Sequence, residues 1–409
     1  MSKTARLIAV FFSVVFISFS LGASYFISVH KPPRTFQKII REKNPWIKKG
    51  MFSSRVCNGI QCRLCPFNCF LPDGARGLCR VRANYGGNLV SLVYGKPASV
   101  HLDPIEKKPV FHLLPGSLVY SLATAGCNLY CRSCQNWGIS QIYPEESDNK
   151  VFIPVKLNLF RDSSGNLRAK VENKEVAFLS PADIIKCALN TKCRSVAYTY
   201  SEPVVFYEYM LHTAKLARRK GLKNVMITGG YINQEPLKEI AKYMDVIKVD
   251  LKGFNAEYYR KYVGGELEVL KDVLKTLKEE GVFLEIVNLV IPTLNDSDED
   301  ISRLIDWVKR NLGADTPIFF SRFSPNYKLT NLPATPVETL EKARNQALKR
   351  GLKYVYIGNV PGHQGENTYC PKCHRILIRR YGYMVLFDLV SANGGRCPYD
   401  GTRIPGLWK

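Results

Sequence analysis

The chain has 409 residues, 46% of them apolar, which is enough for a large buried core and excludes a wholly disordered protein. Lys and Arg number 58 against 35 Asp and Glu, and the formal charge of +23 favours an anionic neighbour such as phospholipid, nucleic acid or a phosphorylated substrate. The 13 cysteines fall in tight groups, with the short gaps that are typical of metal ligands and not of disulfides. The cysteine pattern therefore predicts a metalloprotein.

An uncharged stretch runs from Leu7 to Val29. As a helix it can cross the roughly 30 Å hydrocarbon core of a bilayer, and it exceeds the roughly 7 to 15 apolar residues of a signal peptide. We therefore expect a retained, single-pass transmembrane anchor at residues 1–30 and a basic linker at 31–55. Because more Lys and Arg follow the stretch than precede it, the positive-inside rule places the rest of the chain in the cytoplasm, where thiols stay reduced.

Between residues 116 and 360, short β-branched or aromatic runs alternate with amphipathic helical patterns. This alternation predicts an α/β fold with a parallel sheet, open or closed into a barrel, and an active site where the strands end. A polar, hairpin-like insert at residues 143–178 interrupts the alternation, and helices are expected at Pro203–Lys220, Glu268–Glu280 and Pro336–Arg350. The expected strands are Leu118–Thr124, Ser195–Tyr200, Asn224–Gly230, Asp245–Lys252, Phe283–Ile291, Pro317–Phe323 and Tyr354–Asn359.

Three cysteines follow the first of these strands with C-x3-C-x2-C spacing: Cys127, Cys131 and Cys134. Three close thiolates suit three irons of a [4Fe-4S] cluster, and no fourth cysteine follows at once, so one iron is left open for another ligand. The spacing differs from the paired C-x2-C units of structural zinc. The loop is therefore predicted to hold an iron-sulfur cluster with a reactive iron.

Five further motifs surround this loop: D-P-I-E-K-K-P at 103–109, C-Q-N-W at 134–137, A-Y-T-Y-S-E-P at 197–203, V-D-L-K-G at 249–253 and Y-V-Y-I-G-N at 354–359. With them the chain resembles the radical S-adenosylmethionine (SAM) enzymes, and among these the AmmeMemoRadiSam-system enzymes, relatives of pyruvate formate-lyase activating enzyme. The resemblance implies a partial, TIM-like (β/α) barrel. It also implies that SAM binds the open iron and is cleaved reductively to a 5′-deoxyadenosyl radical, which abstracts hydrogen from a substrate.

The same resemblance assigns cofactor-binding residues. Glu202 is implied to accept hydrogen bonds from the SAM ammonium, with hydroxyls beside it, although capping of a helix N-terminus is the alternative role. Asn288 and Arg322 are additional candidates at strand ends, and Trp137 or Tyr130 is expected near the adenine. The set implied to contact SAM is Glu202, Thr199, Ser201, Thr228 and Asp250.

The resemblance also implies partners. These are a reductant such as ferredoxin or flavodoxin, and the other two proteins of the AmmeMemoRadiSam trio. The membrane is expected to be contacted through the anchor, and nucleic acid is not expected as a partner because the chain carries no recognised RNA-binding motif.

Cysteine-rich segments are expected on both sides of the barrel, at residues 56–115 and 361–409. In the first, a structural zinc is the simpler interpretation, and an auxiliary iron-sulfur cluster, which would use the same thiolates, is the alternative. The second is similar to a zinc ribbon whose fourth cysteine is Asp400; Asp400 or His374 could complete a tetrahedron, and a relic without metal is the alternative. The predicted ligands are Cys62, Cys65, Cys69 and Cys79, with Cys57 as a possible fifth, and Cys370, Cys373 and Cys397.

Three rival functions remain at this level. Activation of a glycyl-radical enzyme follows from the relatives just named, and RNA modification follows from the basic charge and the zinc-like segments. A non-enzymatic zinc-binding interaction protein would need only the outer cysteines and gives no reason for the C-x3-C-x2-C loop.

Overall fold

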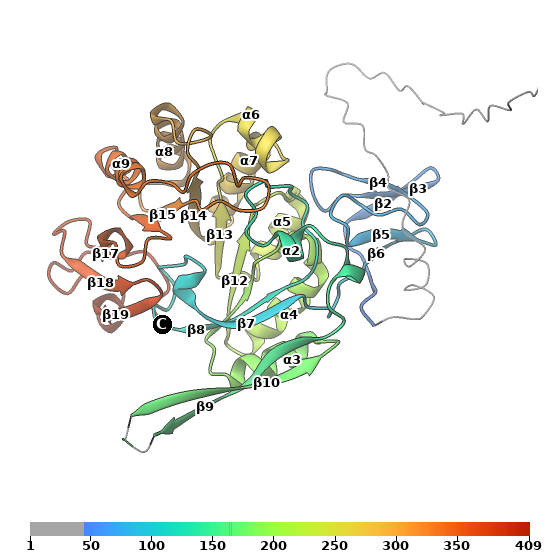
Figure 1. The fold of residues 1–409 in the computed structure, drawn as a ribbon, viewed down its shortest axis with the longest axis horizontal. Helices are drawn as coiled ribbons and strands as arrows, with labels where there is room; N and C mark the ends of the chain where they lie inside the picture. Colours follow the sequence, from blue (N-terminus) through green and yellow to red (C-terminus); the bar gives the residue numbers. More distant parts are fainter. Residues whose placement is uncertain (1–44, 163, 165) are drawn as a thin grey trace, which may run out of the picture.

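A computed structural model describes residues 45–162, 164 and 166–409 (Figure 1). Its centre is an eight-stranded sheet in the order β16-β15-β14-β13-β12-β11-β8-β7, in which β7 is antiparallel to β8 and all the other pairs are parallel. The parallel strands were predicted to within two residues at each end, whereas the edge strand β7 was not predicted. The strands are β7 (Ser99–Pro104), β8 (Leu118–Ala123), β11 (Ser195–Tyr198), β12 (Lys223–Thr228), β13 (Val246–Asp250), β14 (Phe283–Val290), β15 (Ile318–Arg322) and β16 (Val355–Gly358).

Amphipathic helices cover one face of this sheet (Figure 1). In α7, for example, Leu267, Leu270, Leu274 and Leu277 recur at helical spacing and are buried against the core. The expected helix Pro203–Lys220 is divided, because its first turn is a separate 3-10 helix, η3, that Glu202 caps. The main helices are α3 (Pro181–Asn190), α4 (Tyr207–Arg219), α5 (Gln234–Ala241), α7 (Leu267–Glu279), α8 (Asp298–Leu312) and α9 (Val337–Lys349).

Short helices join these elements. They are η1 (Ile105–Lys107), α2 (Trp137–Ser140), η2 (Pro144–Glu146), η3 (Pro203–Phe206), α6 (Ala256–Tyr258), the π-helix η4 (Tyr259–Val263), η5 (Gln364–Glu366) and α10 (Leu389–Ala392). The predicted insert is an antiparallel hairpin of β9 (Val151–Arg161) and β10 (Leu167–Val176), which extends away from the rest of the molecule (Figure 1).

The two cysteine-rich segments lie at opposite ends of the molecule in the view of Figure 1. A buried ion pair between Arg82 and Glu208, 2.9 Å apart and each 2% exposed, joins the first segment to α4. In the second, Trp408 and Ile404 pack in one apolar cluster with Phe319 of β15. Their strands are β1 (Lys48–Lys49), β2 (Ser53–Val56), β3 (Gly59–Cys62), β4 (Phe70–Pro72), β5 (Arg82–Tyr85) and β6 (Asn88–Ser91), and then β17 (Thr368–Tyr369), β18 (Ile376–Tyr381) and β19 (Met384–Asp388).

The predicted membrane anchor at residues 1–30, with most of the basic linker, lies outside the described residues. Within the described part of the chain, no helix is both long and apolar enough to span a bilayer.

Glu285 of β14 makes the stability of the fold depend on pH. Its buried carboxylate accepts hydrogen bonds from the backbone amides of Phe111 (3.1 Å) and His112 (2.9 Å), and burial raises its pKa to about 7 from 4.5. Because the folded-state pKa is the higher one, this contribution to stability is complete below pH 4.5 and is lost as the pH rises to about 7.

The variant Glu285→Gln keeps an acceptor oxygen and removes the charge, so it should not show this loss. Relative to the variant, the wild type should lose about 3 kcal/mol of unfolding free energy between pH 4 and pH 8. Urea unfolding across this pH range measures the difference, and the exposed Glu268→Gln is the control. A difference that does not change with pH would contradict the prediction.

Candidate functional site

The loop with the three predicted cluster ligands leaves the end of β8 and is held by backbone hydrogen bonds. The amides of Tyr130 and Arg132 donate to the carbonyls of Val263 and Tyr262, each at 2.9 Å, so the π-helix η4 supports the loop. The Tyr130 hydroxyl donates to the carbonyl of Leu78 in the first cysteine-rich segment, at 2.8 Å. Sequence reasoning missed η4, because a π-helix has no distinctive residue periodicity.

Cys127, Cys131 and Cys134 line one cavity of about 370 Å³. Burial raises the pKa of Cys127 well above its usual value, and burial raises that of Cys131 to about 11. Two contacts oppose this effect: the Leu129 amide donates to Cys127 Sγ at 3.3 Å, and the Lys252 cation lowers the pKa of Cys131. Cys127 therefore lies beside an amide, and Cys131 near a cation, that favours the thiolate, which is the form that binds metals.

All five residues predicted to contact the cofactor line the same cavity. They come from the carboxyl ends of β11, β12 and β13, which meet at one edge of the parallel sheet. The volume suits a small molecule. The structure thus brings together the cluster loop and Thr199, Ser201, Glu202, Thr228 and Asp250.

Glu202 is 3% exposed and connects two of these strand ends. Its carboxylate accepts hydrogen bonds from the Thr228 hydroxyl (2.5 Å), the Gly229 amide (2.8 Å) and the Val204 amide of η3 (3.2 Å). Burial raises its pKa, and these hydrogen bonds act in the opposite direction. Glu202 therefore caps a helix and also lines the cavity, so the two roles considered for it do not exclude each other.

Gly229, which follows β12, packs against the cluster loop. A Cβ atom at this position would lie 2.5 Å from Cδ1 of Leu129. Since real Cβ contacts are never so close, the cluster loop occupies the space that a side chain at 229 would need.

Lysines surround the cavity. Asp250 accepts hydrogen bonds from Lys248 (2.5 Å) and Lys252 (3.1 Å), and these cations hold its pKa well below the usual value. Lys108 contributes from the other side, and burial lowers its pKa to about 8. Residues 248 and 250 are alternate positions of one strand and share a face, a signal that could have identified Lys248 from the sequence.

Four other candidates lie elsewhere. Asn288 donates to the carbonyl of Leu251, and Arg322 donates to the carbonyl of Thr335. Trp137 stacks on Tyr327 at 5.4 Å between ring centroids. Neither these three residues nor Tyr130 is among the residues that line the cavity, whereas Tyr383 of the second cysteine-rich segment lines it and was not predicted.

The predicted thiols of the first cysteine-rich segment also converge. Cys62, Cys65, Cys69 and Cys79 line one cavity of about 20 Å³. Burial raises the pKa of Cys65, and the other three thiols raise it further. Cys57 is exposed and does not line this cavity.

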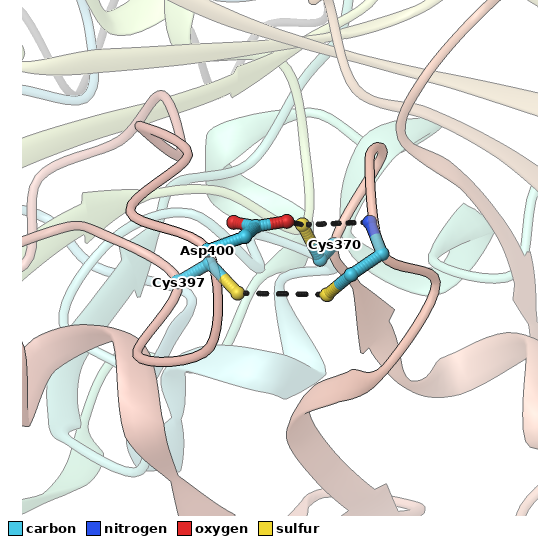
Figure 2. Close-up of side chains that lie close together, drawn as sticks. Cys370, Cys397 and Asp400 are labelled. Atoms are coloured by element: carbon cyan, nitrogen blue, oxygen red, sulfur yellow. Dashed lines mark hydrogen bonds between the residues drawn. The ribbon is translucent and has the colours of Figure 1, made fainter.

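The second segment brings four ligand atoms within 4.8 Å of one another, from Cys370, Cys373, Cys397 and Asp400 (Figure 2). The sulfurs of Cys373 and Cys397 are 3.7 Å apart, and Cys370 Sγ lies 3.3 Å from a carboxylate oxygen of Asp400. With Zn–S bonds of about 2.3 Å, the sulfurs around a tetrahedral zinc are about 3.8 Å apart. The donor set fits such an ion, and its fourth member is Asp400, whereas His374 does not belong to the group.

The chain is similar to several known proteins. The radical SAM superfamily matches residues 121–307. An uncharacterized protein of Methanocaldococcus jannaschii is 43% identical over 359 residues, which are 88% of this chain and 99% of the relative. The pyruvate formate-lyase-activating enzyme of Clostridium pasteurianum is 26% identical over 163 residues, 39% of this chain and 68% of that enzyme. A solved radical SAM methyltransferase from Sphaerobacter thermophilus aligns with a TM-score of 0.44 and 10% identity, over 82% of this chain and 85% of the other.

Gly126, next to Cys127, offers a test of how closely the cluster loop is packed. It has φ +92°, and a Cβ there would lie 2.5 Å from Val81 and 2.6 Å from the carbonyl oxygen of Cys79. Gly281 has φ +73° and no atom within 4 Å of its Cβ position, so Gly281→Ala suffers the backbone strain alone. We expect Gly281→Ala to cost about 1–2 kcal/mol of unfolding free energy.

Gly126→Ala should lower the unfolding free energy by about 1–3 kcal/mol more than Gly281→Ala does, because overpacking against Val81 and Cys79 is added to the backbone strain. Urea unfolding of the two variants measures the difference. Equal losses would show that the two cysteine loops can separate without cost.

Proposed function

The chain belongs to the radical SAM superfamily, and we propose that it is an enzyme of the AmmeMemoRadiSam type that cleaves SAM reductively and uses the resulting radical to abstract hydrogen from a substrate. The observation that carries this proposal is that Cys127, Cys131, Cys134 and Glu202 share one cavity at the strand ends. The narrower assignment is supported by the five motifs around the loop. The superfamily implies both a [4Fe-4S] cluster and SAM.

The residues present fit these two cofactors. Thiolates are the ligands of iron-sulfur clusters, and no fourth cysteine lines this cavity in the described part of the chain, so one iron has no protein thiolate. When bound, the cluster supplies the electron that splits SAM into methionine and the 5′-deoxyadenosyl radical.

The chain holds and orients these groups. Glu202 is placed to accept a hydrogen bond from the SAM ammonium, and the Thr228 hydroxyl and Gly229 amide fix the orientation of its carboxylate. Lys252 and Lys248 carry positive charge to the same cavity, beside Asp250. Leu129 fills the space over Gly229, so the loop packs directly against the residues that follow β12.

A second candidate function is activation of a glycyl-radical enzyme. It is favoured by the similarity to pyruvate formate-lyase-activating enzyme, over 68% of that enzyme's length. In that case the hydrogen would come from a glycine of a protein substrate. Incubation with SAM, reductant and candidate proteins distinguishes the two, because only activation leaves a glycyl-radical signal in electron paramagnetic resonance.

The proposed partners follow from the reaction and from the sequence. Each SAM cleavage needs one electron, which we assign to a small reductant protein of the ferredoxin or flavodoxin class. The other two proteins of the AmmeMemoRadiSam trio remain proposed partners. The apolar stretch from Leu7 to Val29 supports a membrane anchor with the catalytic part on the cytoplasmic side.

The cluster assignment predicts the result of replacing Cys127, Cys131 and Cys134 together by Ala. Reductive SAM cleavage should be abolished, because no thiolates remain to hold the cluster. The formation of 5′-deoxyadenosine after anaerobic reconstitution measures cleavage. Cys187→Ala, which removes a buried thiol of α3 outside the cavity, should retain it. Cleavage by the triple variant would refute the assignment.

Glu202→Gln keeps the shape of the side chain and removes its charge. It should weaken SAM binding by roughly 1.5–3 kcal/mol, the contribution of one charged hydrogen bond. Equilibrium dialysis of the reconstituted protein measures this. Asp388→Asn is the matched control, since Asp388 caps α10 and does not line the cavity. Unchanged affinity in Glu202→Gln would leave Glu202 a capping residue only.

We also propose that the second cysteine-rich segment binds one zinc ion through Cys370, Cys373, Cys397 and Asp400. Elemental analysis should show that Asp400→Ala and Cys397→Ser lose this zinc and that His374→Ala retains it. Both losses should lower the melting temperature, because a structural metal contributes its binding energy to folding. Zinc loss in His374→Ala alone would assign the fourth ligand to the histidine.

A further inference from the structure

We propose that the four thiols of the first cysteine-rich segment bind a second [4Fe-4S] cluster and not a zinc ion. The ligands are Cys62, Cys65, Cys69 and Cys79. This inference concerns a site separate from the SAM cavity, and it does not depend on the proposed reaction.

The first argument is the spread of the thiols compared with the other end of the chain. Within the described residues, the group of Figure 2 is the one set of three or more Cys, His, Asp or Glu whose ligand atoms all lie within 4.8 Å of one another. No three of the thiols at 62, 65, 69 and 79 are that close together, and neither are those of the cluster loop at 127, 131 and 134. The first segment thus resembles the cluster loop in its spacing and differs from the zinc-like group.

The second argument is the space between the thiols. All four line the same cavity of about 20 Å³. A cavity needs roughly 10–15 Å³ to hold one water molecule. The space that the four thiols line is therefore large enough for a group of at least the size of a water molecule. Zinc would hold its sulfurs at about 2.3 Å and leave no such space. In a cubane each of four corner irons takes a single thiolate, which spreads the sulfurs apart.

The third argument is the surroundings of the cavity. Leu64, Leu71, Val204 and Val205 cover it with buried apolar side chains. Arg82 also lines it, and its Nε has no hydrogen-bond partner among the described residues although the residue is 2% exposed. A buried donor without a partner is costly, and the sulfur of an anionic cluster would accept its hydrogen bond.

The cavity adjoins the cluster loop. Asn128, the residue after Cys127, lines it, and so do Val204 and Val205 of η3, the helix that Glu202 caps. A Cβ at Gly126 would lie 2.6 Å from the carbonyl oxygen of Cys79, so the backbones of the two loops touch. The cavity of the proposed second cluster therefore lies next to the loop that carries Cys127.

The test uses the full chain with Cys127, Cys131 and Cys134 replaced by Ala, reconstituted anaerobically with iron and sulfide. We expect about four irons per chain to remain, with the Mössbauer spectrum of a [4Fe-4S] cluster, against about eight in the wild type. Absence of iron, with zinc bound instead, would overturn the proposal. About two irons per chain would also overturn it, because that count belongs to a [2Fe-2S] cluster.

Further variants in the same background assign the ligands. Cys62→Ala with Cys65→Ala should remove the remaining iron, whereas Cys57→Ala, an exposed thiol outside the cavity, should keep it. Retained iron in the double variant would refute these ligands. The triple variant is read by metal content alone, so failure of SAM cleavage in the wild type would refute the proposed function and leave this result unaffected.

Discussion

One buried carboxylate connects the parts of the site. Glu202 begins η3, accepts hydrogen bonds from residues 228 and 229 at the end of β12, and lies in the same cavity as the cluster loop. A buried charge is tolerated only where such donors surround it. The strand ends and the capped helix are therefore held in one arrangement, and Glu202 lines the cavity that the cluster loop also lines.

The three groups of cysteines differ in how the backbone spaces their ligand atoms. In the second segment four ligand atoms lie close together, and the sulfurs of Cys373 and Cys397 are 3.7 Å apart. Such close spacing suits a single ion. Thiols placed around a cavity suit a cluster, because the inorganic core occupies the space between them. A positively charged side chain lines each of these two cavities. Arg82 lines the cavity of the first cysteine-rich segment, and Lys252 lines the cavity beside the cluster loop.

Much of the fold and of the cavity at the strand ends could be predicted from the sequence. The alternation of strands and helices identified the parallel sheet, and the C-x3-C-x2-C spacing identified the loop after β8. The family resemblance implied that Thr199, Thr228 and Asp250 contact one cofactor, and they line one cavity, because parallel strands end at one edge of a sheet. These features are local patterns or follow from a general rule of topology.

The sequence by itself determined the ligand types and their spacing, since these are properties of short stretches of chain. Only the tertiary structure decided which distant groups meet: η4 under the cluster loop, Tyr383 at the cavity, and the backbone of Cys79 against Gly126. It also showed that Asp400, and not His374, lies with the three cysteines of the second segment. The thiols of the first segment instead surround a cavity. The physical reason is that such contacts depend on how whole elements pack, and packing depends on the shapes of side chains that are far apart along the chain.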